Sequence, residues 1–329
     1  MIPCFLVIDK PAGVTSHDVV AAVRAVTGVK KVGHTGTLDP FATGVLPLAL
    51  GGATRLIQFL DESIKVYDAT IALGTCTDTG DCTGKVIREG PLPTADAAGV
   101  DAVLSSFIGD RMQKPPAYSA VKHKGKRLYQ YARKGETVEV PARPIVIHDM
   151  RRLGYDGNEL RVEITCSRGT YARVLADEVA SALGSAGHLS ALQRPRSGPF
   201  YLDDALSMAQ LAEQVAPDSG KPWQEVVLRR AAKEERVPWR PRDDVRAALT
   251  PWLRRPLEVL SQLPLADVSD VAARRVRNGG PPPPPPPGTP AGGRYAVVHG
   301  ADLVAVAENA ARGPRVLRTL ASGSIAGGR

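Results

Sequence analysis

Residues 31–44 read Lys-Val-Gly-His-Thr-Gly-Thr-Leu-Asp-Pro-Phe-Ala-Thr-Gly, the densest run of turn-forming and chemically active residues in the chain. Its three glycines and its proline disfavour a helix or a strand, so the stretch predicts a shaped loop. Such a loop presents His34 and Asp39 where functional groups commonly sit. The competing interpretation is an ordinary turn in which Asp39 and the threonines bond to backbone amides.

The loop offers little to a metal or a phosphate-bearing cofactor. No second histidine or carboxylate stands at ligand spacing, and the glycines match neither the Walker pattern nor the dinucleotide fingerprint. The four cysteines lack the short spacing of a zinc hook and are expected to be reduced, structural thiols. We therefore expect no metal and no organic cofactor. A hydrolase using Asp39 and His34 is disfavoured because no Ser or Cys nucleophile completes the set.

Outward from the loop, strand-like and helix-like patterns alternate, which predicts a mixed α/β core. A strand at 5–8 leads into a helix that begins near Ser16, whose hydroxyl is expected to cap it. Between 67 and 73 the apolar period becomes two, so Tyr67 should lie on the packed face of a strand. Thr94 is expected to open another helix.

A second junction of strand and helix follows farther along the chain. Residues 160–166 alternate as a strand that runs into Ser-Arg-Gly-Thr and then into a helix ending at Gly184. This places Tyr171 and Arg173 in a first helical turn, at the end of a strand. Arg173 could support that junction structurally, act chemically, or do both.

The chain length of 329 residues favours two domains. We expect a catalytic domain at 1–215, a Trp-containing basic insertion or linker at 216–260, and a small β-rich domain at 261–329. Few packing contacts are expected across such a boundary. Seven consecutive prolines, 281–287, should form an extended loop between two elements of the last domain. We expect a solvated spacer; a proline-recognition ligand is the alternative.

The net charge of +8, from 42 Lys plus Arg against 34 Asp plus Glu, favours a polyanionic partner. Residues 111–134 carry eight Lys or Arg, no acidic residue and three interleaved tyrosines, which is the best local signature for RNA binding. Candidate phosphate contacts are Lys122, Lys124, Lys126 and Arg127. A solvated charged face is the alternative. No apolar run is long enough to span a bilayer and no secretory signal is evident, so we expect a cytoplasmic protein.

Six separate motifs occur in order along the first two hundred residues: Asp9-Lys-Pro-Ala-Gly-Val-Thr-Ser-His-Asp, Gly33-His-Thr-Gly-Thr-Leu-Asp-Pro, Lys65-Val-Tyr, Pro115-Pro-Ala-Tyr-Ser-Ala-Val-Lys, Ser167-Arg-Gly-Thr-Tyr-Ala-Arg and His188-Leu-Ser-Ala-Leu-Gln-Arg. With these motifs together, the sequence resembles the TruB family of bacterial tRNA pseudouridine synthases. The resemblance covers about residues 5 to 200. It implies a pseudouridine synthase core with a mixed, largely antiparallel sheet, and the C-terminal block resembles the PUA RNA-binding domain.

The resemblance also implies an activity and roles for individual residues. The enzyme would isomerise uridine 55 in the T loop of tRNA, by base flipping and with an aspartate nucleophile. Asp39 matches that nucleophile, Arg173 the arginine that pairs with it, and Tyr67 the tyrosine that stacks on the base. Tyr171 and Leu192 match residues lining the uridine pocket, and His34 matches the histidine that supports the gap left by the extruded nucleotide.

Each of these assignments has a plainer alternative. Tyr67 and Leu192 could be ordinary core residues of a packed sheet.

The implied partner is the T arm of tRNA, with no membrane and no obligatory protein partner, and the chain is expected to act as a monomer. The alternative functions are a guide-RNA-dependent pseudouridine synthase and a non-catalytic RNA-binding or tRNA-folding factor.

Overall fold

The computed structural model describes residues 3–61, 64–119, 121–132, 134–136, 138–228 and 238–320. The chain divides into two compact units. Unit 1 combines residues 1–39, 45–61 and 199–329, and unit 2 combines 40–44 and 62–198. The units are therefore not consecutive stretches of sequence, because the N-terminal and C-terminal parts of the chain belong to the same unit.

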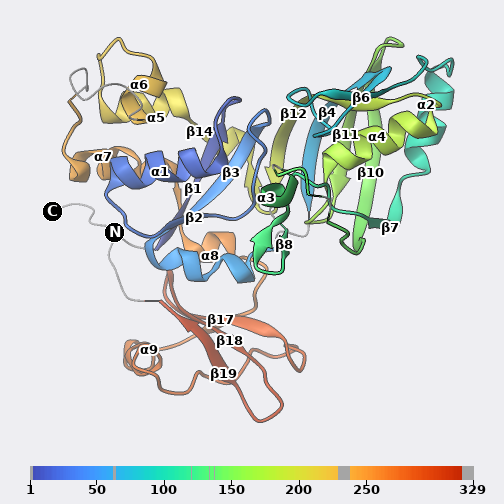
Figure 1. Ribbon diagram of the computed structural model, residues 1–329. Helices are drawn as coiled ribbons and strands as arrows, with labels where there is room; N and C mark the ends of the chain where they lie inside the picture. The colour runs from blue at the N-terminus through green and yellow to red at the C-terminus, as the bar shows by residue number, and fades with distance from the viewer. Residues whose placement is uncertain are drawn as a thin grey trace. The chain divides into compact units, whose positions relative to one another are not determined.

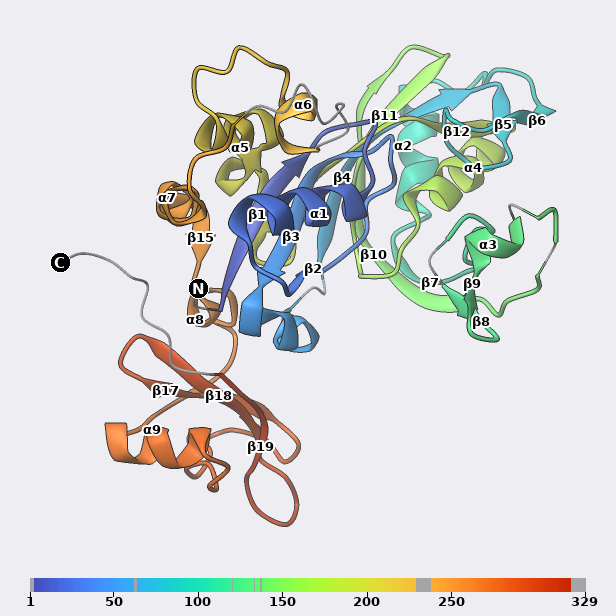
Figure 2. The same ribbon diagram turned by 60° about the vertical axis from the view of Figure 1, so that its left-hand side comes forward.

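Unit 1 contains a small sheet in the order β14-β1-β3, with β2 paired to β3 and β15 paired to β1. Helix α1 lies along these strands in both views (Figures 1 and 2). The elements are β1 (Cys4–Lys10), α1 (Ser16–Thr27), β2 (Val32–His34), β3 (Thr43–Leu50), η1 (Gly51–Arg55), η2 (Ile57–Phe59), β13 (Phe200–Tyr201), η3 (Leu202–Asp204), β14 (Leu206–Ser207), α5 (Met208–Val215), α6 (Trp223–Val227), α7 (Arg242–Ala248), η5 (Thr250–Trp252), β15 (Leu253–Arg254) and α8 (Pro256–Val259). The first residues of β3, Thr43 and Gly44, belong to unit 2.

The rest of unit 1 is a four-stranded sheet, β16-β17-β18-β19, with helix α9 (Figure 1). The elements are β16 (Leu265–Asp267), α9 (Asp270–Arg277), β17 (Arg294–His299), β18 (Asp302–Glu308) and β19 (Arg315–Thr319). The prolines 281–287 form the expected loop, between α9 and β17. The loop is attached to the sheet because the buried Tyr295 hydroxyl donates to the carbonyl of Pro283 at 2.6 Å.

One hydrophobic core joins the two parts of unit 1, although the composition of the segment after residue 215 predicts few packing contacts across it. Phe5 and Phe59 from the N-terminal part belong to the same buried cluster as Val298 and Leu303 from the C-terminal sheet. The expectation of weak packing is therefore wrong. Ala53 of η1 and Phe59 of η2 are buried in this cluster, so apolar side chains of the C-terminal sheet help to cover the two short helices. Buried members of the cluster are Phe5, Val7, Val45, Ala49, Ala53, Leu56, Phe59, Leu60, Phe200, Val259, Leu260, Ala296, Val298, Leu303, Val306 and Leu320.

The segment expected to be an insertion, 216–260, contributes several elements to unit 1. Strand β15 pairs antiparallel with β1, Leu253 opposite Leu6. In α7, Arg246 donates to the carbonyl of Thr27 at the end of α1, at 3.1 Å. Residues 229–237 of the segment lie outside the described residues. The described part therefore packs on the unit instead of standing apart from it.

Unit 2 is built on five antiparallel strands in the order β12-β4-β11-β10-β7. Thr43 and Gly44 of β3 add a parallel pairing to β12. Mixed α/β architecture with a mixed, largely antiparallel sheet is thus confirmed. The elements are β4 (Lys65–Leu73), β5 (Thr75–Thr77), β6 (Val86–Glu89), α2 (Ala97–Ser105), β7 (Gly109–Gln113), β8 (Lys122–His123), β9 (Lys126–Arg127), α3 (Leu128–Ala132), β10 (Arg143–Tyr155), β11 (Glu159–Cys166), α4 (Ala172–Ala182) and β12 (Gly187–Ser197).

Two helix starts differ from the sequence-based expectation. Thr15, not Ser16, caps α1: its side chain accepts from the Asp18 amide in a capping box. The second helix begins at Ala97 with Asp96 as its cap, not at Thr94, because the Asp96 carboxylate accepts from the Gly99 amide at 2.8 Å. The Ser16 hydroxyl instead bonds to the backbone of Leu38.

Candidate active site

The packed face of β4 carries two of the predicted site residues. Tyr67, Ala69, Ile71 and Leu73 are buried while the residues between them are less so, as the period of two predicts. Leu192 of β12 pairs with Ala69, and directly paired residues of antiparallel strands share a face. Tyr67 and Leu192 therefore lie two residues apart on one face of the sheet of unit 2.

Helix α4 covers this same face. A side chain at Gly187 would lie 2.4 Å from the Cβ of Ala180 and 3.2 Å from Ile71, so only glycine lets the helix approach so closely. Arg173 is the second residue of α4, and Tyr171 is its N-cap residue. The structure thus brings the helix that carries Arg173 onto the strand face that carries Tyr67 and Leu192.

Arg173 is only 5% exposed, and its guanidinium is held from two other segments. Nη1 donates to the carbonyl of Thr79 and Nη2 donates to the carbonyl of Tyr118, each at 2.7 Å. A buried arginine needs such acceptors because its charge has lost its water. Arg173 is therefore held in position and direction by α4, which carries it, and by the backbone at Thr79 and Tyr118.

A buried carboxylate that no sequence motif singled out lies beside this arginine. Oδ2 of Asp81 is 3.8 Å from Nη1 of Arg173, and both side chains are almost fully buried. Its other oxygen, Oδ1, accepts from the Thr79 hydroxyl at 2.8 Å, the Thr83 amide at 3.0 Å and the Thr83 hydroxyl at 2.5 Å. These three hydrogen bonds orient the Asp81 carboxylate beside the guanidinium of Arg173.

The turn between Thr79 and Asp81 depends on a glycine. Gly80 has a φ of +73°, which L side chains rarely adopt, and a Cβ there would meet the Cβ and the carbonyl oxygen of Arg173 at 3.3 Å. The turn can therefore follow the start of α4 closely enough for both of its flanking residues to reach the guanidinium.

The other two predicted site residues, His34 and Asp39, lie in unit 1. His34 is half-buried and ends β2, opposite Leu48, so the loop is shorter than residues 31–44 suggested, since β2 and β3 take its two ends. The buried Ser16 hydroxyl donates to the carbonyl of Leu38 at 3.0 Å and accepts from the Leu38 amide at 2.9 Å. Ser16 therefore fixes the residue that precedes Asp39. Asp39 is half-buried and is the last residue before the chain enters unit 2.

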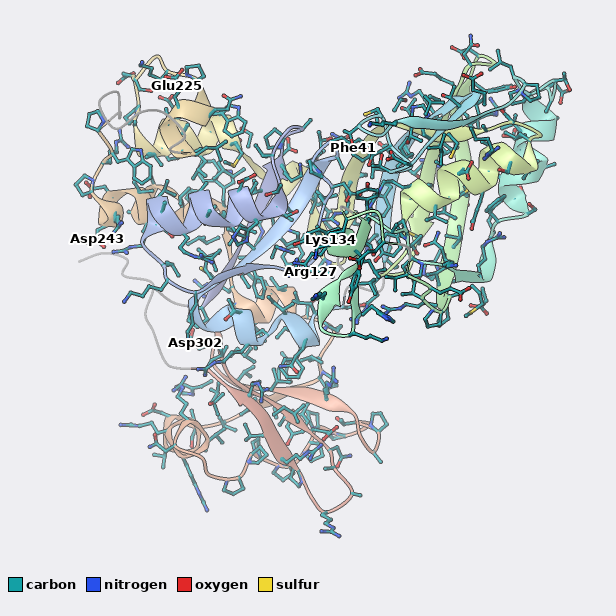
Figure 3. The ribbon with its side chains drawn as sticks, viewed as in Figure 1. Phe41, Arg127, Lys134, Glu225, Asp243 and Asp302 are labelled. Carbon is teal, nitrogen blue, oxygen red and sulfur yellow. The ribbon has the colours of Figure 1, made fainter. Side chains whose placement is uncertain are left out.

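The described residues of the basic stretch 111–134 are divided among β7, β8, β9, α3 and the loops beside them. Arg111 lies on β7 with its guanidinium 4.3 Å from the centre of the Phe107 ring. The predicted phosphate contacts gather on an arm, defined as β8, β9 and α3, residues 122–132, whose hairpin turns at Lys124 with a φ of +46°. Lys124, Lys126 and Arg127 are exposed there, and Figure 3 labels Arg127 on the hairpin. The side chain of Lys122 lies outside the described residues.

Other reactive groups near the site do not compete with these residues. Burial raises the pKa of the Cys166 thiol to about 11, so the thiol is protonated at neutral pH and is a poor nucleophile. Burial and the neighbouring Glu163 raise the pKa of Asp68, but Asp68 occupies the opposite face of β4 from Tyr67. Among the described residues, no three His, Cys, Asp or Glu side chains group to hold a metal ion.

Comparison with known proteins identifies the family. The family model described as TruB family pseudouridylate synthase (N terminal domain) matches residues 24–172. The tRNA pseudouridine synthase B of Geotalea uraniireducens (strain Rf4) is 47% identical over 211 residues, which cover 64% of this chain and 68% of that protein. The chain belongs to the TruB family of pseudouridylate synthases. The namesake of Geobacter sulfurreducens is 50% identical over 209 residues, covering 64% of this chain and 69% of the relative.

Solved structures agree with the fold of a TruB family member. The chain aligns with a structure entitled Crystal Structure of a Cbf5-Nop10-Gar1 Complex with a TM-score of 0.64 at 23% identity, over 98% of this chain and 84% of the other. A second, of the archaeal box H/ACA sRNP Nop10-Cbf5 complex, gives a TM-score of 0.63 at 22% identity, over 97% and 85%. Identity this low supports the shared fold alone. Membership of the TruB family makes the chain an isomerase that converts uridine to pseudouridine.

Asp81 gives a first test of the site in this TruB family member. We expect Asp81→Asn to slow pseudouridine formation about tenfold or more, because the guanidinium loses the charge that helps to hold it in place. The measurement is the single-turnover rate on an RNA substrate at saturating enzyme. Asp177→Asn is the matched control, since it removes a carboxylate paired with Arg88 at the surface of the same unit. A wild-type rate for Asp81→Asn would contradict the expectation that Asp81 helps to hold the guanidinium of Arg173 in place.

Proposed function

We propose that this chain isomerises uridine 55 in the T loop of tRNA. The observation that carries the proposal is the buried Arg173, held by the carbonyls of Thr79 and Tyr118 on the helix that covers Tyr67 and Leu192. Relatives that are 43–50% identical are named tRNA pseudouridine synthase B, which supports tRNA as the substrate. Sequence identity of this level favours these relatives over the Cbf5 proteins, at 22–23%, as guides to the substrate.

The reaction breaks the bond between N1 of uracil and the sugar, turns the base, and joins C5 to the same carbon. In our proposal Asp39 is the nucleophile, attacking the sugar or the base, and Arg173 keeps its carboxylate charged and oriented. A target base inside a folded T loop must first be extruded, and His34 supports the gap that it leaves.

The apolar part of the proposed pocket comes from unit 2. Tyr67 stacks on the extruded base and assists removal of the C5 proton, while Leu192 and Tyr171 exclude water from the detached uracil. Tyr67 and Leu192 are 8% and 7% exposed, which fits a wall that is packed from behind and open to a ligand on one side. An enzyme of this design needs neither a metal nor an organic cofactor.

Two regions would bind the remainder of the tRNA. We assign phosphate contacts to Lys122, Lys124, Lys126 and Arg127 on the arm. We propose that 261–329 is a PUA-like domain that binds tRNA away from the target uridine. The catalytic domain is assigned to 1–215, and the Trp-containing basic insertion or linker to 216–260. We further propose a cytoplasmic monomer without an obligatory protein partner. Among the described residues, no helix is both long and apolar enough to cross a bilayer.

The experiment that tests the function is pseudouridine mapping. The purified chain should convert uridine 55 in a tRNA transcript, and in an unguided T-arm hairpin, without any added RNA or protein. Conversion only with a guide RNA would favour the guide-dependent alternative. Binding and refolding of tRNA with no pseudouridine formed would favour a non-catalytic RNA-folding factor.

The arm makes a separate prediction about salt dependence. Replacing Lys124, Lys126 and Arg127 by alanine should weaken tRNA binding and reduce the slope of log K against log salt by roughly 2, since each lost phosphate contact removes about 0.7–0.9. The single-turnover rate at saturation should change little. Lys85 and Arg161, exposed cations of the same unit outside the arm, provide the control variants. An unchanged salt slope would assign the arm to the solvated surface.

A further inference from the structure

A buried glutamine is attached to the backbone at the start of α4. Gln113, the last residue of β7, is 3% exposed. Its Oε1 accepts from the amide of Tyr171 at 2.8 Å and its Nε2 donates to the carbonyl of Tyr171 at 3.2 Å. One side-chain amide thus satisfies both polar groups of one backbone residue, in the manner of a paired strand.

Gln113 holds the residue at the start of α4, a helix end that has no side-chain cap of its own. Tyr171 is the N-cap residue of α4, and its own side chain makes no capping hydrogen bond. The Tyr171 carbonyl also accepts from the amides of Val174 and Leu175 in the first turn of α4. Gln113 therefore bonds to the residue from which the helix starts. Only a primary amide offers a donor and an acceptor at this spacing, which neither an acid nor an apolar side chain of the same length supplies.

Gln113 also belongs to the segment that holds the guanidinium. Five residues after Gln113, the carbonyl of Tyr118 accepts from Nη2 of Arg173, which lies two residues after Tyr171. Segments 113–118 and 171–173 are therefore joined at both ends, at one by the glutamine amide and at the other by the arginine. Just beyond, the carbonyl of Ser119 accepts from the amide of Tyr129 in α3, so the same segment continues into the arm.

We propose that Gln113 is a positioning residue for Arg173: by holding the Tyr171 backbone it sets where α4 begins and hence where the guanidinium lies. The inference rests on the proposed function, in which Arg173 orients the nucleophile. Gln113 touches no reacting atom in this scheme, and its effect passes through the arginine. A displacement of the guanidinium by about 1 Å would be enough to slow the chemical step severely.

The test is a double-mutant cycle on single-turnover pseudouridine formation in a tRNA transcript. Gln113→Met keeps the length of the side chain and removes both hydrogen bonds, and should slow the step about tenfold or more while changing tRNA affinity less than about twofold. In an Arg173→Lys background, Gln113→Met should not lower the rate further, because the guanidinium that Gln113 positions is already absent. Rate losses that multiply in the double variant would overturn the proposal, as would a wild-type rate for Gln113→Met alone.

A stability control separates positioning from general weakening of the fold. Gln262→Met removes a similar bond, from the glutamine amide to the carbonyl of Phe59 in unit 1, and should leave the rate unchanged. If Gln113→Met does not fold, Gln113→Glu, which keeps the acceptor for the Tyr171 amide, takes its place in the cycle with the same expectations. A wild-type rate for Arg173→Lys would instead refute the role of Arg173 in the proposed function.

Discussion

Asp39→Asn is expected to abolish pseudouridine formation, with a loss of at least about a thousandfold, while tRNA binding is largely preserved. The amide keeps the size of the side chain and its place after Leu38, but it lacks the charge that makes the carboxylate a nucleophile. The measurement is single-turnover conversion of uridine 55, together with the tRNA affinity of the same preparation.

Asp68→Asn is the matched control for this variant. Asp68 is a carboxylate on β4 but on the face away from Tyr67, so its loss should leave the rate near that of the wild type. Near-wild-type turnover by Asp39→Asn would remove Asp39 from the mechanism. Loss of tRNA binding in parallel with the rate would show that the aspartate serves the fold of the loop.

Deletion of residues 261–329 is expected to destabilise unit 1 strongly, not merely to weaken tRNA binding. The cut would expose the side of the shared core that contains Phe59, Leu56 and Leu260. Exposure of three such side chains costs roughly 5 kcal/mol, which is comparable with the whole stability of many domains. We therefore expect an insoluble or unfolded fragment, tested by expression and by thermal unfolding.

A single substitution examines the same core without removing the domain. Leu303→Ala, in the buried cluster, should lower the unfolding free energy by about 2–5 kcal/mol, whereas Leu265→Ala, at a side chain that is 52% exposed, should change it far less. Both leucines lie in the C-terminal sheet, so they differ mainly in burial. A soluble 1–260 fragment with the unfolding temperature of the full chain would contradict the idea that the cluster supports unit 1.

Local sequence patterns were sufficient where one element determines the outcome. The alternation from 67 to 73 predicted the packed face of β4 correctly, because a strand turns successive side chains to opposite sides whatever it packs against. The separate motifs predicted the family and the mixed fold. The roles assigned to Asp39, Tyr67 and Arg173 came from the resemblance and stay predictions until the variants are measured.

Contacts between distant segments were decided only by the tertiary structure. Gln113 meets Tyr171 across 58 residues of sequence, and Thr79 meets Arg173 across 94. Such contacts join a side chain to a backbone group, which every residue possesses, so they leave no periodic signal in the sequence. The core that Phe5 and Phe59 share with Val298 escaped prediction for a related reason: an apolar pattern shows that a face is buried, but not which later segment buries it.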